Sequence, residues 1–334
     1  MNILVTGGAG FIGSHVCVKL LELGSKVIVI DNYCNSHPSA LKNVSIISKK
    51  NNLIFIKGDI RNQNPLIEIF SKYKIDAVIH LAGLKSVHDS LKNPSKYYSN
   101  NVVGSQNLFN LMKEANCKTI IFSSSATVYG FSEEMPLSEE SVIFPNNPYG
   151  KNKKNIEDIL KNLYKLDDSW KIAILRFFNP IGAHKSRLIG DNPLESPNNL
   201  MPYILKVASR ELPMLHIFGN DYNTQDGTGI RDYIHVEDIA SGHVKALTKI
   251  IKKPQLIIAN LGTGIGYSVL DVIKTFEKVT NQKIPYQFSK RRDGDVSESY
   301  SNPSFAKLVF NWEAKYNLED MCIDSWNYKL NNIC

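Results

Sequence analysis

Short apolar runs alternate with helical patterns along the first half of the chain. Unbroken apolar runs at residues 2–5, 26–30, 53–56, 77–80, 119–122 and 172–175 predict strands. Apolar residues spaced three or four apart predict helices at 11–23, 65–72, 94–115 and 149–164. Because each strand is continuously apolar, both of its faces should be buried. The alternation predicts an α/β fold with a doubly wound parallel sheet covered by helices on both faces.

The alternation of predicted strands and helices ends after residue 178. Pro, Asn and Gly are dense between residues 179 and 202, and helical patterns return at 200–212, 233–250, 268–280 and 318–328. We therefore expect two units. The first is a nucleotide-binding domain at 1–178 with a returning segment near 232–250, and the second is a smaller C-terminal α/β lobe at 179–231 and 251–334.

A glycine-rich turn joins the first strand to the first helix. Gly7, Gly10 and Gly13 follow the G-x-x-G-x-x-G spacing and stand between the strand and the helix. That arrangement is typical of a Rossmann-type dinucleotide site, where a pyrophosphate sits on the helix N-terminus. Asp31 ends the second strand, where a carboxylate accepts hydrogen bonds from a ribose. Since no Arg or Lys follows it immediately, the sequence favours NAD over NADP.

Composition and charge narrow the possibilities further. The net charge of +7 comes from scattered basic residues, so we expect neither a nucleic-acid arm nor a membrane surface. The 334-residue chain has no apolar run of the roughly 20 residues that a membrane span needs. Its five cysteines form no disulfide pattern, and a strand beginning at residue 2 leaves no room for a signal peptide. We expect a cytoplasmic enzyme.

Candidate catalytic residues follow the fifth predicted strand. Tyr149 and Lys153 are four apart on a predicted helix and therefore share one face. A tyrosine acts as a base only if its phenolate is stabilised, and a nearby ammonium does this. Ser125 follows the end of the strand, where its hydroxyl can relay a proton. A second Tyr-x-x-x-Lys match at 286–290 lies in a strand-like segment without a glycine turn beside it.

Motifs spread over the whole chain carry a family resemblance. They comprise Thr6-Gly-Gly-Ala-Gly-Phe-Ile-Gly-Ser-His15, Ser123-Ser-Ser-Ala-Thr-Val-Tyr-Gly130, Pro148-Tyr-Gly-Lys, Arg176-Phe-Phe-Asn-Pro180 and Arg231-Asp-Tyr-Ile-His235. Together they resemble the UDP-glucose (UDP-galactose) 4-epimerases, which are extended short-chain dehydrogenases/reductases. The resemblance implies a homodimer that inverts C4 of a UDP-hexose by transient hydride transfer to tightly bound NAD, through a 4-keto sugar.

The resemblance also assigns roles to individual residues. Ser125, Tyr149 and Lys153 are the implied catalytic set. Besides the glycine turn and Asp31, the implied NAD-binding residues are Phe11, Ile12, Asn32, Tyr33, Cys34, Asn35, Ser36, Asp59, Ile60, Leu81, Ala82, Gly83, Leu84, Lys85, Asn100 and Phe178. The implied UDP-sugar residues are Asn179, Asn199, Leu200, His216, Ile217, Phe218, Arg231, Arg292, Asp295 and Ser299.

Ser299 departs from the usual family pattern. Many members have a tyrosine at this position, which narrows the pocket around the sugar C2 substituent, whereas this chain has Ser299 followed by Tyr300. If Ser299 faces the sugar, an N-acetyl group fits, and we expect UDP-GlcNAc and UDP-GalNAc as further substrates. If a local shift brings Tyr300 into the gap, they are excluded.

Other functions remain open at this stage. A nucleotide-sugar 4,6-dehydratase shares the fold and the Tyr/Lys pair, but it needs carboxylates where this chain has residues 126–128, Ala-Thr-Val. A UDP-glucuronate-modifying enzyme needs an added cation. A non-catalytic NAD-binding regulator has no need of Ser125, Tyr149 and Lys153 together. The eight histidines lack partners at ligand spacing, so no metal is expected.

Overall fold

A seven-stranded parallel sheet forms the larger part of the molecule. The computed structural model describes residues 1–132, 134–194, 197, 199–292 and 294–332. Its sheet has the order β10-β6-β5-β4-β1-β2-β3, and every neighbouring pair is parallel. The strands are β1 (Asn2–Thr6), β2 (Lys26–Asp31), β3 (Leu53–Lys57), β4 (Ala77–His80), β5 (Thr119–Ser123), β6 (Lys171–Phe177) and β10 (Gln255–Leu261). The predicted doubly wound α/β sheet is confirmed.

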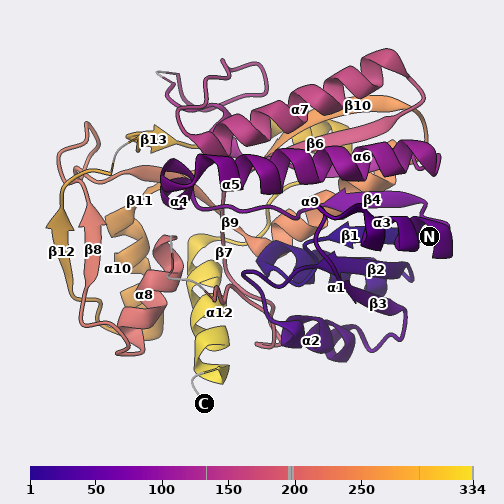
Figure 1. Ribbon diagram of the computed structural model, residues 1–334. Coiled ribbons are helices and arrows are strands. Elements are labelled where there is room, and N and C mark those ends of the chain that lie inside the picture. Colours follow the sequence, from indigo (N-terminus) through magenta and orange to yellow (C-terminus); the bar gives the residue numbers. More distant parts are fainter. Residues whose placement is uncertain (133, 195–196, 198, 293, 333–334) are drawn as a thin grey trace.

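Helices cover both faces of this sheet (Figure 1). The helices of the first face are α1 (Phe11–Glu22), α2 (Pro38–Ser48), α9 (Val236–Ile250) and α11 (Ser304–Phe310). Those of the second face are α3 (Gln63–Lys72), α6 (Gly104–Glu114) and α7 (Pro148–Leu166). Strand side chains alternate between the two layers, so Ile3 packs into one core and Leu4 into the other. Both faces are therefore buried, as the unbroken apolar runs require.

The helix expected at 94–115 is interrupted once. It consists of α5 (Pro94–Tyr98), a π-helical turn, η1 (Ser99–Val103), and α6. The short α4 (Val87–Lys92) precedes it, and a 3₁₀ turn, η2 (Ala126–Val128), follows β5. A π-turn inserts an extra residue into the helix and redirects the side chains around it. Here both Asn100 and Asn101 are buried, and the Asn101 side chain hydrogen-bonds the backbone of Leu84 in the loop that follows β4.

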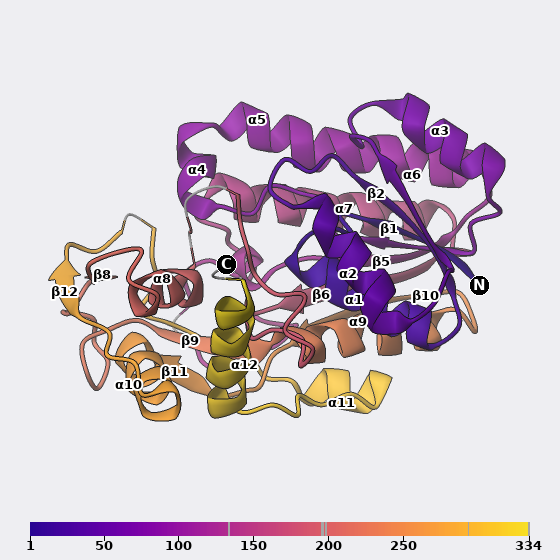
Figure 2. The same ribbon diagram turned by 90° about the horizontal axis from the view of Figure 1, so that it is seen from below.

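The smaller lobe lies beyond the carboxyl ends of the sheet strands (Figures 1 and 2). Its helices are α8 (Leu200–Ala208), α10 (Val269–Thr280) and α12 (Leu318–Asn331). Its strands are β7 (Asn179–Ile181), β8 (Leu215–Phe218), β9 (Ile230–His235), β11 (Gly266–Ser268), β12 (Tyr286–Ser289) and β13 (Glu298–Ser299). A separate apolar core, which includes Met201, Ile217 and Phe276, holds the lobe together.

Three expectations from the sequence are corrected. The helix predicted at 233–250 begins only at Val236, because residues 233–235 complete β9 and pair with β7. The helix predicted at 200–212 ends at Ala208, and Arg210 nearby adopts a left-handed conformation with φ of 62°. Strand β10 lies within the segment 251–334 that we expected in the lobe, but it pairs with β6 in the large sheet. Cys334 lies outside the described residues.

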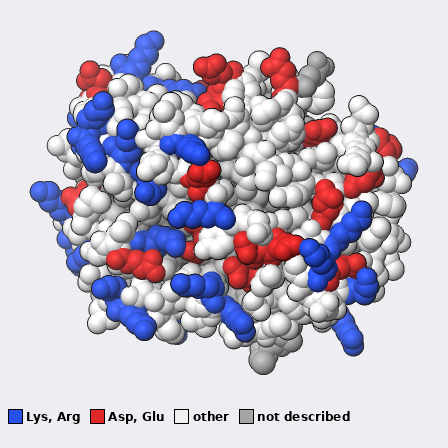
Figure 3. Space-filling model, turned by 180° about the vertical axis from the view of Figure 1, so that it is seen from behind, with Lys and Arg blue, Asp and Glu red and all other residues white. Residues whose placement is uncertain are grey.

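Charged side chains of both signs are interspersed on the face seen in Figure 3. Within the described ranges, no helix is both long enough and apolar enough to cross a membrane. The same residues contain no group of three or more His, Cys, Asp or Glu side chains placed to hold a metal ion.

Candidate active site

A large cavity of about 1300 Å³ runs between the sheet and the lobe. Its wall contains Ser125, Tyr149 and Lys153 and nearly all of the residues that the sequence assigned to cofactor and substrate. Three of those residues do not line it: Tyr33, His216 and Ile217. Tyr33 packs against the apolar core of the first sheet face, Ile217 lies in the core of the lobe, and His216 hydrogen-bonds Ser289 on β12. The sequence therefore located the wall correctly but could not tell a side chain facing the cavity from its neighbours.

The glycine turn at one end of the cavity has no room for side chains. A Cβ atom on Gly7, whose φ is 72°, would lie 2.7 Å from the backbone nitrogen of Ala82. A Cβ atom on Gly13 would overlap the carbonyl oxygen of Gly7. Helix α1 begins just after Gly10 with no side-chain cap and no acidic residue in its first turn. Its first N–H groups are thus left for an anion, which fits the pyrophosphate of a dinucleotide.

Asp31 is held in place at the edge of the turn. Its carboxylate accepts hydrogen bonds from the backbone N–H groups of Ala9 (3.0 Å) and Tyr33 (2.8 Å) and from the hydroxyl of Ser36 (3.0 Å). These donors fix its orientation and keep its charge at the cavity wall. A fixed carboxylate suits ribose hydroxyls and repels a 2′-phosphate, so the site fits NAD.

Asp59 forms the neighbouring part of the wall. Its carboxylate binds the guanidinium of Arg61 at 2.7 Å and accepts a hydrogen bond from the Asn32 amide at 2.9 Å. The hydrogen bonds from Arg61 lower the pKa of Asp59 to about 2. Asp59 therefore stays ionised across the physiological range and offers a fixed acceptor beside Ile60.

The catalytic candidates meet where β5 ends and α7 begins. The Asn147 side chain caps α7 by accepting from the N–H of Gly150 at 2.9 Å, which sets Tyr149 in the first turn. One turn later, the Lys153 ammonium donates to the Ser123 carbonyl at 2.7 Å and lies 5.9 Å from the centre of the Tyr149 ring. The predicted alignment of the two side chains is present.

Burial sets the protonation of these groups. It raises the pKa of Tyr149 to about 12, and the hydrogen bond with Ser125 opposes that rise. Burial also lowers the pKa of Lys153 to about 8, and the carboxylate of Glu157 opposes that fall. The Ser125 hydroxyl accepts from the backbone N–H of Thr127 at 3.2 Å and from its hydroxyl at 3.0 Å. These donors leave the Ser125 proton available for Tyr149 or for a substrate oxygen.

The second Tyr-x-x-x-Lys match has a different setting. Tyr286 lies on strand β12 with 44% of its surface exposed, and Lys290 follows the end of that strand. In a strand, residues four apart are separated by roughly 13 Å along the chain. This pair therefore lacks the helical stacking that brings Tyr149 and Lys153 together.

Cationic side chains gather at the lobe end of the cavity. Arg292 lies over the Phe218 ring, with 3.9 Å between its guanidinium carbon and the ring centre. Arg231 pairs with Asp295 at 2.7 Å, so these two predicted substrate residues contact each other. Arg231 also donates to the carbonyl of Val296 at 2.8 Å. Guanidinium groups can bind phosphate oxygens in pairs, but both Nη groups of Arg231 here donate to Asp295 and to backbone carbonyls.

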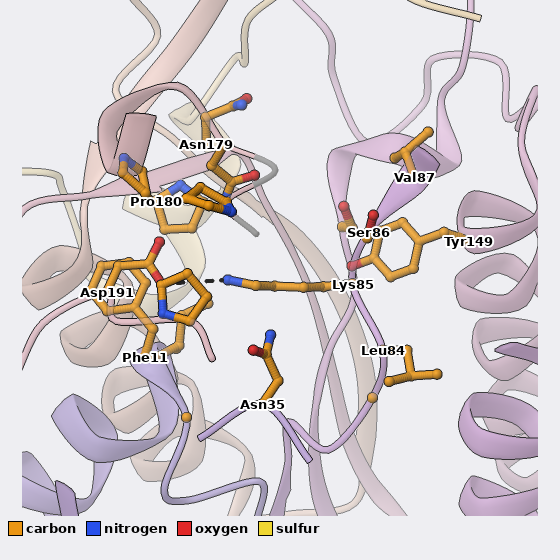
Figure 4. Close-up of a pocket in the computed structure, with 18 of the residues that line it drawn as sticks. Phe11, Asn35, Leu84, Lys85, Ser86, Val87, Tyr149, Asn179, Pro180 and Asp191 are labelled. Atoms are coloured by element: carbon orange, nitrogen blue, oxygen red, sulfur yellow. Dashed lines mark ion pairs between the residues drawn. The ribbon is translucent and has the colours of Figure 1, made fainter. Parts of the chain in front are cut away.

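Two wall residues that the sequence did not single out are Asp191 and Tyr328. The Asp191 carboxylate lies 3.6 Å from the Lys85 ammonium, and Figure 4 shows this ion pair crossing the pocket between the loop after β4 and the opposite wall. Asp191 lies in the stretch dense in Pro, Asn and Gly, where no local pattern marks its role. The ion pair links the two sides of the cleft.

Ser299 and Tyr300 take different positions. Ser299 is on β13 and lines the cavity, whereas Tyr300 does not. The Tyr300 carbonyl accepts from the N–H of Leu137 at 2.8 Å, and its ring lies against Gly266. The smaller residue of the two therefore faces the pocket.

A Rossmann-type sheet with a glycine turn, and a Tyr–Lys pair beside a strand-end serine, define a short-chain dehydrogenase/reductase. The family model for GDP-mannose 4,6 dehydratase matches residues 4–325. The UDP-glucose 4-epimerase of Bacillus subtilis (strain 168) is 49% identical over 333 residues, which cover 100% of this chain and 98% of that protein. The chain therefore belongs to the UDP-glucose 4-epimerase family.

Solved structures agree with this assignment. The UDP-glucose 4-epimerase from Bifidobacterium longum, crystallised with NAD+ and UDP, is 46% identical and has a TM-score of 0.97, with 99% of each chain covered. The UDP-Glc/GlcNAc 4-epimerase from Campylobacter jejuni is 33% identical and has a TM-score of 0.85, again with 99% of each chain covered.

Proposed function

We propose that this protein is a UDP-hexose 4-epimerase that interconverts UDP-glucose and UDP-galactose with a tightly bound NAD. The observation that carries the proposal is that one cavity joins the glycine turn, Tyr149 and the arginines of the lobe. The names of relatives at nearly half identity over the whole chain support the same activity. The substrate's pyrophosphate would lie at Arg231 and Arg292, with its sugar directed toward Tyr149.

The protein's own residues supply the proton chemistry. Tyr149 removes the proton of the sugar 4-hydroxyl and later returns one, with Ser125 bonding the same oxygen. A bound NAD, held by the glycine turn and Asp31, would supply the hydride acceptor and donor that inversion of the sugar at C4 requires. Because burial raises the pKa of Tyr149 to about 12, its phenolate requires nearby positive charge, and Lys153 supplies part of it.

We also propose activity on UDP-GlcNAc and UDP-GalNAc. Ser299 lines the cavity and Tyr300 does not, so the wall has a small side chain where an aromatic ring would narrow it. The name of the Campylobacter jejuni enzyme includes a GlcNAc substrate, which is compatible with a roomy pocket in this family.

A 4,6-dehydratase is the main competing activity, given the family model that matches the chain. Elimination of water across C5 and C6 needs a further acid/base pair next to the strand-end serine. Here that place is taken by η2, whose residues Ala126, Thr127 and Val128 carry no carboxylate. A UDP-glucuronate-modifying enzyme or a non-catalytic NAD-binding regulator is favoured by no contact in the cavity.

Two further proposals concern the oligomeric state of the protein and its location in the cell. Tyr98 and Val103, on the helical segment from Pro94, remain exposed although both are large and apolar. A homodimer in which this segment and α7 pack against their symmetry mates would cover them. Cys17, Cys117 and Cys322 are buried free thiols, in keeping with a reducing compartment such as the cytoplasm.

The deciding experiment is to incubate the purified protein with UDP-galactose and separate the products by chromatography. We expect UDP-glucose, and a 4-keto-6-deoxy product would replace the proposal with a dehydratase. Tyr149→Phe is expected to keep its NAD and to lose turnover by a factor of roughly 10² to 10⁴. Near-normal turnover in that variant would remove Tyr149 from the mechanism.

A further inference from the structure

A buried ion pair lies directly behind the catalytic residues. Glu157 follows Lys153 by one turn of α7, and its carboxylate accepts hydrogen bonds from Arg176 of β6. The Arg176 Nε lies at 3.0 Å and the Nη2 at 2.7 Å from the two carboxylate oxygens. Glu157 is 0% exposed and Arg176 is 1% exposed. Neither residue lines the cavity, so both act on the reaction only through other groups.

The same carboxylate holds the end of β5. The hydroxyl of Ser124, which is fully buried, donates to Glu157 Oε1 at 2.6 Å. Ser124 lies between Ser123, whose carbonyl anchors Lys153, and Ser125, whose hydroxyl bonds Tyr149. One side chain therefore ties the helix to the strand end that presents both partners of the catalytic pair.

Charge around Lys153 depends on this carboxylate as well. The titratable groups that interact with Lys153, among the residues described, are Tyr149 and Glu157 of its own helix and His80 of β4. Burial lowers the pKa of His80 to about 3, which leaves it neutral. Glu157 is thus the negative charge that favours the Lys153 ammonium.

Two further cations hold Glu157 in turn. Arg176 binds its carboxylate from β6, and Lys161, one turn further along α7, approaches it to 3.6 Å. The other side of the Arg176 guanidinium donates to the Tyr129 hydroxyl at 3.1 Å. The carboxylate is consequently fixed on every side.

Stability alone does not account for such a pair. Removing two charges from water costs as much as their attraction returns, and well-packed apolar side chains fill the same space equally well. An apolar pair would support neither Ser124 nor the charge on Lys153. Two of the features that an apolar pair would lose, the Ser124 hydrogen bond and the charge beside Lys153, act on the active site.

We propose that Glu157, held by Arg176, is a positioning residue that fixes the Ser123–Ser125 strand end and keeps Lys153 charged beside Tyr149. This inference rests on the proposed epimerase function, because the value of a charged Lys153 lies in stabilising the Tyr149 phenolate. It assigns no contact between Glu157 and the substrate or cofactor.

The test compares two double variants of the protein as purified with its cofactor. Glu157→Gln/Arg176→Gln removes both charges of the pair, so neither partner is left buried and ionised without the other. Lys19→Gln/Glu237→Gln is the matched control, because that ion pair links α1 and α9 with Glu237 buried and neither residue lining the cavity. The pKa of Lys153 is measured by NMR titration of carbon-13-labelled lysine, and its signal is identified by its absence in Lys153→Met.

We expect the pKa of Lys153 to fall by about one unit in the first variant, a roughly tenfold change in proton affinity. Since activity is lost as Lys153 deprotonates, the alkaline limb of the turnover profile should move to lower pH by the same amount. The KM for UDP-galactose should not change, and the control should leave the Lys153 titration as in the wild type. An unchanged pKa in the folded variant, or an equal shift in the control, would overturn the inference.

Ser124→Ala decides the matter if the double variant does not fold. It removes one hydrogen bond and no charge, and we expect turnover to fall severalfold at constant KM, whereas unchanged turnover refutes the positioning role. The proposed function and the positioning role can fail separately. If the wild-type protein does not convert UDP-galactose but the pKa of Lys153 still differs between the wild type and the Glu157→Gln/Arg176→Gln variant, the proposed function is wrong and the positioning role stands.

Discussion

Three buried histidines predict a steep loss of stability in mild acid. Burial lowers the pKa of His80 to about 3 and the pKa values of His15 and His243 to about 4, from an ordinary value of 6.5. The hydrogen bonds of His80 fit a neutral ring. The Ser105 hydroxyl at its Nε2 already donates to a carbonyl and so accepts from the ring, and the Thr6 hydroxyl lies 2.7 Å from its Nδ1.

The direction in which stability changes with pH follows from the direction of these pKa shifts. Well above pH 6.5 the histidines are neutral in both the folded and the unfolded chain and contribute no pH dependence. As the pH falls from 6.5 toward 4, only the unfolded chain takes up protons, so the free energy of unfolding decreases. Each histidine then lowers it by about 2 kcal/mol between pH 7 and pH 5. Three of them together give about 5 to 6 kcal/mol, a large part of a typical total stability.

Urea unfolding at pH 7, 6 and 5, at one fixed cofactor concentration, measures this loss. His243→Gln should make the slope between pH 6 and pH 5 shallower by about 1.2 kcal/mol per pH unit, slightly less than the effect of one full proton. Ile79→Val is the control, because it weakens the packing of the sheet face that α9 covers without removing a titrating group. A slope in His243→Gln equal to that of the wild type would mean that the folded protein binds this proton, and the burial argument would be wrong.

Three further predictions concern the cavity. Gly13→Ala places a Cβ atom on the Gly7 carbonyl, so the protein should purify with little cofactor and be destabilised by about 1–3 kcal/mol; full cofactor content, measured by absorbance of the denatured supernatant, contradicts this. Asp191→Asn removes a negative charge from a cleft that accepts anionic ligands, so it should lower the Kd for UDP severalfold, as measured by calorimetry. The melting temperature should change little, because its partner Lys85 is half exposed. Weaker UDP binding would show that Asp191 itself supports the ligand. Ser299→Tyr should abolish conversion of UDP-GalNAc and spare UDP-galactose, and an equal loss of both would place Ser299 elsewhere in the mechanism.

The sequence was sufficient for features that depend on short-range patterns. The unbroken apolar runs of β1 to β6 and the spacing of Gly7, Gly10 and Gly13 are local, and so is the helical spacing of Tyr149 and Lys153. The sequence places Tyr233 in a helix because Tyr233, Ile234 and Val236 run without a break into the apolar positions of α9. Only pairing with β7, a long-range contact, distinguishes the strand end from the helix.

Other parts of the site depend on contacts that no spacing reveals. Glu157 and Arg176 are 19 positions apart in the sequence, and each looks like an ordinary helix or strand residue until α7 packs on β6. Lys85 and Asp191 meet only because the chain after β7 returns across the cleft. His216 and Ile217 were placed with Phe218, but alternation along β8 turns the side chain of Ile217 into the lobe core.

The order of the large sheet also bears on how the chain is made. Helix α9 and strand β10 complete a domain whose other strands all lie before residue 178. A nascent chain that has emerged only as far as residue 178 lacks α9, so part of one sheet face, including Ala173 and Leu175, has no cover. The N-terminal domain therefore cannot finish folding on the ribosome until the intervening lobe segment has also emerged. Truncated translation products ending in that interval should depend on chaperones and be prone to aggregation.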